Sequence, residues 1–456
     1  MATDARVRCG EAATDSTSKS QHNRHMRFAR LQCESEGTPV GLNELVTPEQ
    51  LDFIQLDYSR PRMAPIEGRA VAELSECALG FADATRALIK TLFLDPDLRV
   101  VTSAGWSDAY GTVEHAAAVL VEGGCGELPM SAVRGSNLLP ILEMLVAEHV
   151  DLKNSKTGAP WHELQDPILA ADLQLGAGPI ATALAEQARI VVAGCFDQAS
   201  PTTAAAVLQL GWSWDDRDSL AASALAAHAA AWCDWQPEGT ELPISPWLPS
   251  RVELDETGRS LVNVTSDADA AARRLQEHLR SSSVSNGSLA HADVRLDSSR
   301  VFCRTKGPRQ VAVDGAVGAR TDGCWKLEVL YQAGYVAEAM IEFAETSNAQ
   351  TRRHLAGVAR AHLQPPDAGG LLIVEPLQSM RDSGVGWLHV AYQSKSREAC
   401  KYFADQTVRL ATAHRPLIRL ASGPPRLHVH CGVWHARVPR DAVDIAVETR
   451  LAKEWI

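Results

Sequence analysis

A glycine-rich turn between two short apolar segments constrains the fold of this chain more than any other feature. Residues 168–175 (ILAADLQL) can form a strand and are followed by the turn Gly176–Pro179 (GAGP). Proline suits the first turn of a helix, where its missing N–H is not needed. Apolar residues then recur four positions apart, and a second apolar segment follows at 189–194 (RIVVAG). We therefore predict a strand–helix–strand crossover, which joins parallel strands of an α/β sheet.

The same alternation extends to both sides of this unit. Further strands are predicted at 26–32, 51–57, 98–102 and 132–135, and helices at 70–92, 110–122, 201–210 and from Asp216 to about Trp232. Strand and helix patterns that alternate over this length predict the α/β class, with a mostly parallel sheet and flanking helices.

The rest of the chain has a different pattern. Residues 325–343 alternate in polarity and predict a hairpin with its turn at Ala333-Gly334, and 351–363 predict a helix. The sequence QPPDAGG at 364–370 is typical of a linker between domains. Residues 371–456 are expected to form a small α+β domain, with strands at 371–374, 386–392 and 426–433 and helices at 397–412 and 440–453. The α/β domain is thus expected at 26–363, after a polar, disordered tail at 1–25.

Composition argues against several classes of protein. A net charge of −12 leaves no general basic surface, so we expect no nucleic-acid partner. We find no segment apolar enough to span a bilayer and no secretory signal, so we expect no membrane partner and a cytoplasmic location. Ten cysteines occur singly without a CxxC pair, which is typical of reduced thiols rather than of disulfides or a zinc site. No metal is expected.

Loops after the predicted strands supply the candidate site, because ligands bind at the carboxyl ends of strands in open α/β sheets. An acidic pair at 215–216 precedes a helix, and one of the two carboxylates is expected to cap it. The residues that we expect to be catalytic are Asp197, Asp215 and Ser103, and those that we expect to bind the ligand are Gly176, Gly178, Asp172, Gly105 and Gln198.

Each motif also has a plainer interpretation. Residues 176–181 fit a relaxed dinucleotide fingerprint, with Asp197 21 residues after Gly176, but they also fit a phosphate site at a helix N-terminus or a simple tight turn. His228 lies on an apolar helical face, where a packed histidine is commoner than a general base. The histidines at 428, 430 and 435 do not share one strand face, which favours a solvated sheet over a metal site.

Three segments together resemble the acyclic terpene utilisation (AtuA) family of bacterial proteins. They read LGAGPIATALAEQARIVVAG, LQLGWSWDDRDSLAASALAAH and KLEVLYQAGYVAEAMIEF. Order and spacing agree from about residue 27 to 363, and the tail from 370 is similar to the ferredoxin-like domain of many members. The family is associated with catabolism of acyclic terpenoids, in which intermediates travel as coenzyme A thioesters. The resemblance therefore implies a small acidic substrate.

The chain departs from the family pattern at its loops. Where members typically have Gly-Arg-Val-Ala-Asp after the central strand, this chain has GCFDQ at 194–198, and their Asn-Ala-Gly-Gly turn is SAGW at 103–106. An arginine and a carboxylate would suit an acidic substrate and a proton transfer. Cys195 and Gln198 stand in their places, and Asp197 replaces the carboxylate only if the loop shifts by one residue.

The sequence is compatible with three functions. The first is an enzyme that acts on a small carboxylic acid or an acyl-coenzyme A thioester by proton transfer, hydration or cleavage, with coenzyme A as part of the substrate. The second is a non-catalytic relative that binds a ligand or a partner chain. The third is an NAD-dependent oxidoreductase that uses the glycine turn. The resemblance also makes a homo-oligomer plausible. We favour the first function.

Overall fold

The computed structural model describes residues 24–33, 37–45, 51–58, 76–106, 108–232, 250–264, 267–281, 288–344, 349–365, 369–377, 385–415 and 418–456. The tail predicted at 1–25 lies outside these residues except for its last two positions.

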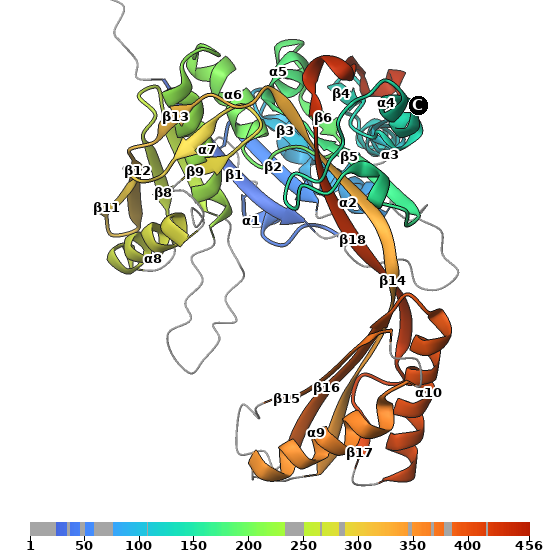
Figure 1. Cartoon of the computed structure of the whole chain (residues 1–456). Coiled ribbons are helices and arrows are strands. Elements are labelled where there is room, and N and C mark those ends of the chain that lie inside the picture. Colours follow the sequence, from blue (N-terminus) through green and yellow to red (C-terminus); the bar gives the residue numbers. More distant parts are fainter. Residues whose placement is uncertain are drawn as a thin grey trace, which may run out of the picture.

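Ten of the described strands form one mixed sheet, the body of the molecule (Figure 1). Its order is β11-β12-β8-β7-β1-β2-β3-β6-β4-β19. The five central strands are parallel, and antiparallel strands extend both edges. The strands are β1 (His25–Cys33), β2 (Phe53–Tyr58), β3 (Arg99–Thr102), β4 (Pro129–Arg134), β6 (Ile190–Ala193), β7 (Arg251–Asp255), β8 (Ser260–Asn263), β11 (Phe302–Gly307), β12 (Gln310–Asp314) and β19 (Ala446–Leu451). The α/β class is confirmed, and its parallel part is limited to the centre of the sheet.

Helices cover both faces of the parallel strands, because successive side chains of a buried strand point to opposite faces. Phe53 of β2 belongs to one apolar cluster and its neighbour Ile54 to another. The Ile54 face is covered by α2 (Glu76–Leu94) and α3 (Ala109–Glu122), and the Phe53 face by α5 (Ala177–Ala185), α6 (Ser200–Leu210) and α7 (Arg217–Ala231). The remaining helices of the body are α1 (Leu42–Leu45), α4 (Leu142–Ala147) and α8 (Ala268–Ser281). None of the described helices combines the length and the apolar content needed to cross a lipid bilayer.

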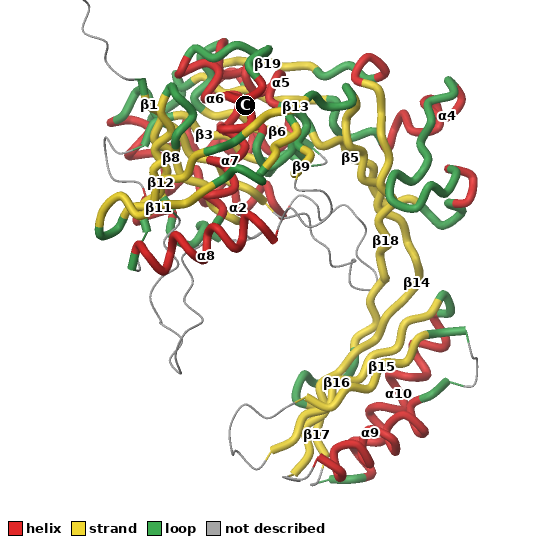
Figure 2. The backbone as a smooth tube through the Cα atoms, turned by 60° about the vertical axis from the view of Figure 1, so that its left-hand side comes forward, coloured by secondary structure: helices red, strands yellow, loops and turns green. Residues whose placement is uncertain are grey.

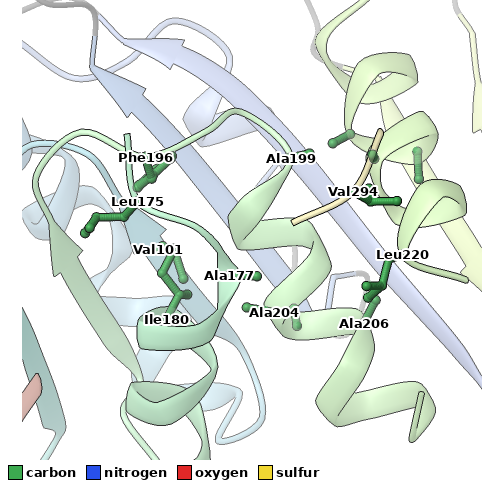
Figure 3. Close-up of a cluster of buried hydrophobic side chains, with 14 of the residues drawn as sticks. Val101, Leu175, Ala177, Ile180, Phe196, Ala199, Ala204, Ala206, Leu220 and Val294 are labelled. Atoms are coloured by element: carbon green, nitrogen blue, oxygen red, sulfur yellow. The ribbon is translucent and has the colours of Figure 1, made fainter. Parts of the chain in front are cut away.

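The predicted parallel pairing across the glycine turn is wrong. β5 (Ile168–Gln174) pairs antiparallel with the long strand β14 (Cys324–Ala344). Its end still reaches β6, because Leu175 forms a parallel bridge with Phe196, and Figure 3 shows these two side chains beside each other. The predicted helix follows as α5, with Pro179 in its first turn. The glycine turn therefore reaches the carboxyl edge of the parallel sheet although its strand belongs to a different sheet.

The predicted hairpin at 325–343 is also wrong, because β14 continues without reversing. β18 (Arg426–Pro439) pairs with it on both sides of Gly334, and the chain accommodates the irregularity as a β-bulge between Gln332 and Gly334. Gly334 has a φ of +152°, which an L side chain rarely adopts. The bulge bends the strand instead of turning it.

The second half of β14 begins a smaller unit with ferredoxin-like topology. The chain continues through α9 (Ala349–Leu363), β15 (Leu371–Leu377), β16 (Val385–Ser394), α10 (Arg397–Ala413) and β17 (Ile418–Leu420) into β18. Its strands have the order β15-β16-β14, with β17 and β18 also paired to β14. Elements from both sides of residues 364–370 thus share this sheet. Figures 1 and 2 show β14 and β18 running side by side from the body into this unit.

The helix predicted at 440–453 is absent from the described structure of that segment. The short turn η4 (Arg440–Ala442) leads to β19, which pairs with β4, and η5 (Ala452–Glu454) follows. The other short elements of the body are η2 (Leu139–Ile141), η3 (Trp161–Glu163) and a small sheet of β9 (Ser288–Ala290), β10 (Arg295–Asp297) and β13 (Val317–Ala319).

We expect Gly334→Ala to lower the free energy of unfolding by about 1–3 kcal/mol. A Cβ atom at Gly334 would lie 2.5 Å from the carbonyl oxygen of Ser394, and the backbone there has a positive φ. The control is Gly357→Ala in α9, where no heavy atom lies within 4 Å of the new methyl group. The control should be neutral or stabilising by up to about 1 kcal/mol. Urea denaturation measures the free energy of unfolding of both variants. An equal change in Gly334→Ala and Gly357→Ala would contradict a strained bulge at Gly334.

Candidate functional site

Buried polar side chains gather near the carboxyl ends of β1 and β2, on the face covered by α6 and α7. Arg30 and Asp57 form an ion pair whose side chains are only 5% and 10% exposed. Gln55 Nε2 donates to Asp57 Oδ1 at 2.9 Å and to the carbonyl oxygen of Gln198 at 3.0 Å. Thr202 Oγ1, at the start of α6, donates to Gln55 Oε1 at 3.2 Å. This network ties the two strands to the loop that follows β6.

Asp197 lies in that loop and is almost completely buried, with 6% of its side chain exposed. Its Oδ1 lies 2.7 Å from Nδ1 of His291 and accepts the N–H of Ala199 at 3.1 Å. Lys326 Nζ of β14 lies 3.3 Å from Oδ2. Burial opposes the charged form, but the charges of His291 and Lys326 and these hydrogen bonds outweigh it and hold the pKa of Asp197 well below its usual range. Asp197 is therefore ionised at neutral pH.

A second histidine extends this arrangement. Nε2 of His228, in α7, lies 3.1 Å from Nε2 of His291. Burial, the positive charge that His291 carries when it is protonated, and the charge of Arg30 lower the pKa of His228 to about 3, so this imidazole is neutral at pH 7. Asp197, His291 and His228 form a continuous hydrogen-bonded chain from a carboxylate to a neutral base. We call it the Asp–His–His chain.

Asp293 occupies the N-terminus of α5, which the sequence suggested as a phosphate site. Its Oδ2 accepts the N–H of Ala177 at 2.7 Å, and Arg440 Nη2 lies 3.3 Å from Oδ1. Burial raises the pKa of Asp293 despite these partners. Gly176 permits the approach, because a Cβ atom there would lie 2.5 Å from Asp293 Oδ1. The carboxylate of Asp293 thus caps α5 at the position where the sequence suggested a bound phosphate.

Two of the predicted site residues hold strand ends together. Ser103 Oγ accepts the N–H of Tyr58 at 2.9 Å and donates to the carbonyl oxygen of the same residue at 3.3 Å, which joins the ends of β2 and β3. The N–H of Gly105 donates to the carbonyl oxygen of Ala193 at 3.0 Å, and a Cβ atom would lie 2.8 Å from that oxygen. These contacts account for a serine at position 103 and a glycine at position 105 without a bound ligand.

The structure does not bring Asp215 to Asp197. Asp215 is exposed and precedes α7, thirteen residues before His228 in the sequence. At the rise of an α-helix this places the two at opposite ends of α7, about 20 Å apart. Asp216 caps α7 by accepting the N–H of Ser219, as expected for one member of the pair.

The remaining predicted residues lie around the glycine turn. Asp172 is buried in β5, opposite Glu328 of β14. Gly178 is exposed, and no heavy atom lies within 4 Å of the position of a Cβ atom. Gln198 contributes its backbone carbonyl, while its side chain is exposed. Cys195 packs into the apolar cluster on the opposite face of the sheet from the Asp–His–His chain.

The histidines of β18 do not form a metal centre with one another. His435 lies 2.7 Å from Lys156 Nζ and 3.7 Å from Glu328 Oε1, a cation and an anion of the body. Within the described parts of the chain, no group of three or more His, Cys, Asp or Glu side chains is arranged to hold a metal ion.

The local sequence does not predict most of the buried polar residues around Asp197. A signal existed for Gln55 and Asp57, because polar residues at alternate positions of an otherwise apolar strand mark one buried polar face. His291 and Lys326 carry no such local signal. They follow Asp197 by 94 and 129 residues, so only the tertiary fold shows the contact.

Stability should depend on pH through His228. The pKa of His228 is about 3 in the folded protein and about 6.5 in an unfolded chain. Below pH 6.5 the unfolded chain therefore binds a proton that the folded protein does not, and the free energy of unfolding falls as the pH falls toward 3. We expect His228 to lower the free energy of unfolding by about 2 kcal/mol between pH 7 and pH 5. Asp197 does not interfere, because its low pKa places its titration outside this interval.

Urea denaturation at pH 7 and pH 5 tests this expectation with His228→Gln. The variant should lose less stability than the wild type over this interval, whereas His115→Gln, an exposed histidine of α3, should behave like the wild type. An equal loss in the wild type and His228→Gln would contradict the neutral, buried imidazole.

Comparison with known proteins agrees with the resemblance seen in the sequence. The sequence model of the family described as acyclic terpene utilisation family protein AtuA matches residues 34–237 and 285–449. No curated protein and no solved structure matches the chain. The matched segments include Asp197, His228, His291 and Lys326 and cover most of the sequence. The chain therefore belongs to the AtuA family.

Proposed function

We propose that this protein is an enzyme that transfers a proton to or from a small carboxylic acid or its coenzyme A thioester. The observation that carries the proposal is the Asp–His–His chain, with 2.7 Å between Asp197 and His291 and 3.1 Å between His291 and His228. It lies at the carboxyl edge of the parallel strands, where ligands bind in such sheets. A buried carboxylate that orients a histidine is a common arrangement for general acid–base catalysis.

The geometry defines a path for one proton. Asp197 accepts the Nδ1–H of His291, which fixes the tautomer and leaves Nε2 of His291 as an acceptor toward His228. Nδ1 of His228, the ring nitrogen that does not face His291, takes the proton from the substrate. The proton on Nε2 of His228 then passes to Nε2 of His291, and Asp197 stabilises the resulting imidazolium. The reverse sequence returns the proton.

Lys326 keeps the carboxylate ready for this role. Its ammonium group lies 3.3 Å from Asp197 and donates to the carbonyl oxygen of Ala290 at 2.5 Å. A cation at this distance favours the ionised carboxylate, which a buried site alone would disfavour. The loop that carries His291 begins directly after Ala290, so Lys326 also holds that loop against Asp197.

The family supports the choice of substrate class. Acyclic terpene utilisation concerns branched, largely apolar carbon chains, so a short branched acid or its coenzyme A thioester is the natural first substrate to test. The proposal gives Asp215 no part in the chemistry, because it lies at the far end of α7.

The oxidoreductase alternative has weaker support. A dinucleotide fold places its glycine turn between two parallel neighbouring strands, whereas β5 pairs antiparallel with β14. The helix N-terminus that would bind the pyrophosphate already donates to Asp293, and the acid at ribose spacing, Asp197, is paired with His291 and Lys326.

Deuterium exchange tests the proposal without knowledge of the complete reaction. Branched acyl-coenzyme A thioesters and the matching free acids are incubated with enzyme in D₂O, and mass spectrometry follows exchange of the acidic C–H. We expect the wild type to catalyse exchange with at least one of them. His291→Gln and Asp197→Asn should slow it by about 100-fold or more, because each breaks the proton path.

Matched surface variants serve as controls. Asp151→Asn and His115→Gln change the same residue types at exposed positions and should leave exchange unchanged. Binding of a thioester without exchange would instead support a non-catalytic, ligand-binding relative. Stabilisation by NAD alone would support the oxidoreductase.

A further inference from the structure

Arg30 is a buried cation with an unused hydrogen-bond donor. Its side chain is 5% exposed, and its Nε donates to Asp57. Its Nη1 is shielded from solvent and has no hydrogen-bond partner in the described part of the chain. A guanidinium group carries five N–H donors, and a buried donor without an acceptor is destabilising. The Nη1 donors of Arg30 are therefore available to an acceptor that the described part of the chain does not supply.

The position of Arg30 points to the proposed proton-transfer site. Arg30 lies on β1, against which α7 packs, and its positive charge is one of the causes that lower the pKa of His228. Its partner Asp57 is held by Gln55, which also binds the carbonyl of Gln198, the residue after Asp197. One hydrogen-bonded network therefore joins Arg30 to the loop that carries Asp197, and the charge of Arg30 also acts on His228 at the other end of the Asp–His–His chain.

We propose that Arg30 binds a free carboxylate group of the substrate through Nη1 and so presents the substrate to His228. This inference rests on the proposed function. Asp57 faces the Nε edge of the planar guanidinium, and the Nη1 donors point away from that edge. A charged carboxylate oxygen is a stronger acceptor for a guanidinium N–H than the neutral carbonyl oxygen of a thioester. A buried cation with an available donor thus favours a free acid over an acid that is fully converted to its thioester.

Calorimetric titration with an isosteric pair tests the inference. The probes are 3-methylbutanoate and 3-methylbutanamide, which differ in charge and in one acceptor. We expect the wild type to bind the acid at least about tenfold more tightly than the amide. Arg30→Lys keeps a positive charge beside Asp57 but loses the Nη1 donors, and should weaken acid binding by about tenfold or more without changing amide binding.

Arg27→Lys is the matched control. Arg27 lies on the same strand and also pairs with an aspartate, Asp52, at 3.2 Å, but it is at the far end of β1 from the site. It should bind the acid like the wild type. Equal binding of acid and amide, no binding of either, or the same loss in both variants would overturn the inference. The wild-type comparison decides alone if Arg30→Lys fails to fold.

The two proposals fail in different ways. Acid binding that depends on Arg30, without deuterium exchange in any substrate, would contradict the proton transfer and leave the carboxylate site standing. Exchange that proceeds in Arg30→Lys with unchanged KM would contradict the role of Arg30 and leave the proton transfer standing. His291→Gln separates the two proposals further, because it should slow exchange by about 100-fold or more and retain acid binding.

Discussion

The structure of the site depends on keeping one carboxylate charged inside the protein. Asp197 has almost no contact with water, and a buried charge is stable only when cations and hydrogen-bond donors surround it. The donors come from separate parts of the chain: the start of α6, the loop after β9 and the first half of β14. His228 on α7 completes the arrangement through His291. The elements that converge on Asp197 are therefore held together by electrostatics as well as by apolar packing.

Much of the fold could be predicted from local sequence signals. The strands at 26–32 and 51–57, the helix after Pro179 and the cap at 215–216 follow from residue patterns that span only a few positions. Strand pairing is not a local property. The alternation at 325–343 fits a hairpin and a single long strand equally well, and β18, about a hundred residues later, decides between them. Of the residues expected to be catalytic, Asp197 lies in the buried site, whereas Asp215 does not, because α7 carries the two acidic residues at its start away from the sheet edge.

The departures from the family pattern have a physical explanation in this chain. Asp197, one position earlier than the carboxylate of the family loop, points to His291 and Lys326, while Gln198 contributes only its carbonyl oxygen. Cys195 faces the other side of the sheet and packs among apolar residues. A guanidinium group is nevertheless present on the polar face, from Arg30 of β1. One polar face of the sheet thus carries a buried carboxylate and a buried guanidinium, which come from different parts of the chain.

The return of the chain to the large sheet affects how the protein can be assembled during synthesis. β19 completes the sheet by pairing with β4, yet about three hundred residues and the whole ferredoxin-like unit separate the two strands in the sequence. The edge of β4 has no partner until residues 446–451 have left the ribosome. Lys326 lies where β14 pairs with β5, which precedes it in the chain, and with the end of β18, which follows the helices of the ferredoxin-like unit. Strand edges of β4 and of β14 therefore stay unpaired, and exposed to other chains, until the C-terminal residues are made.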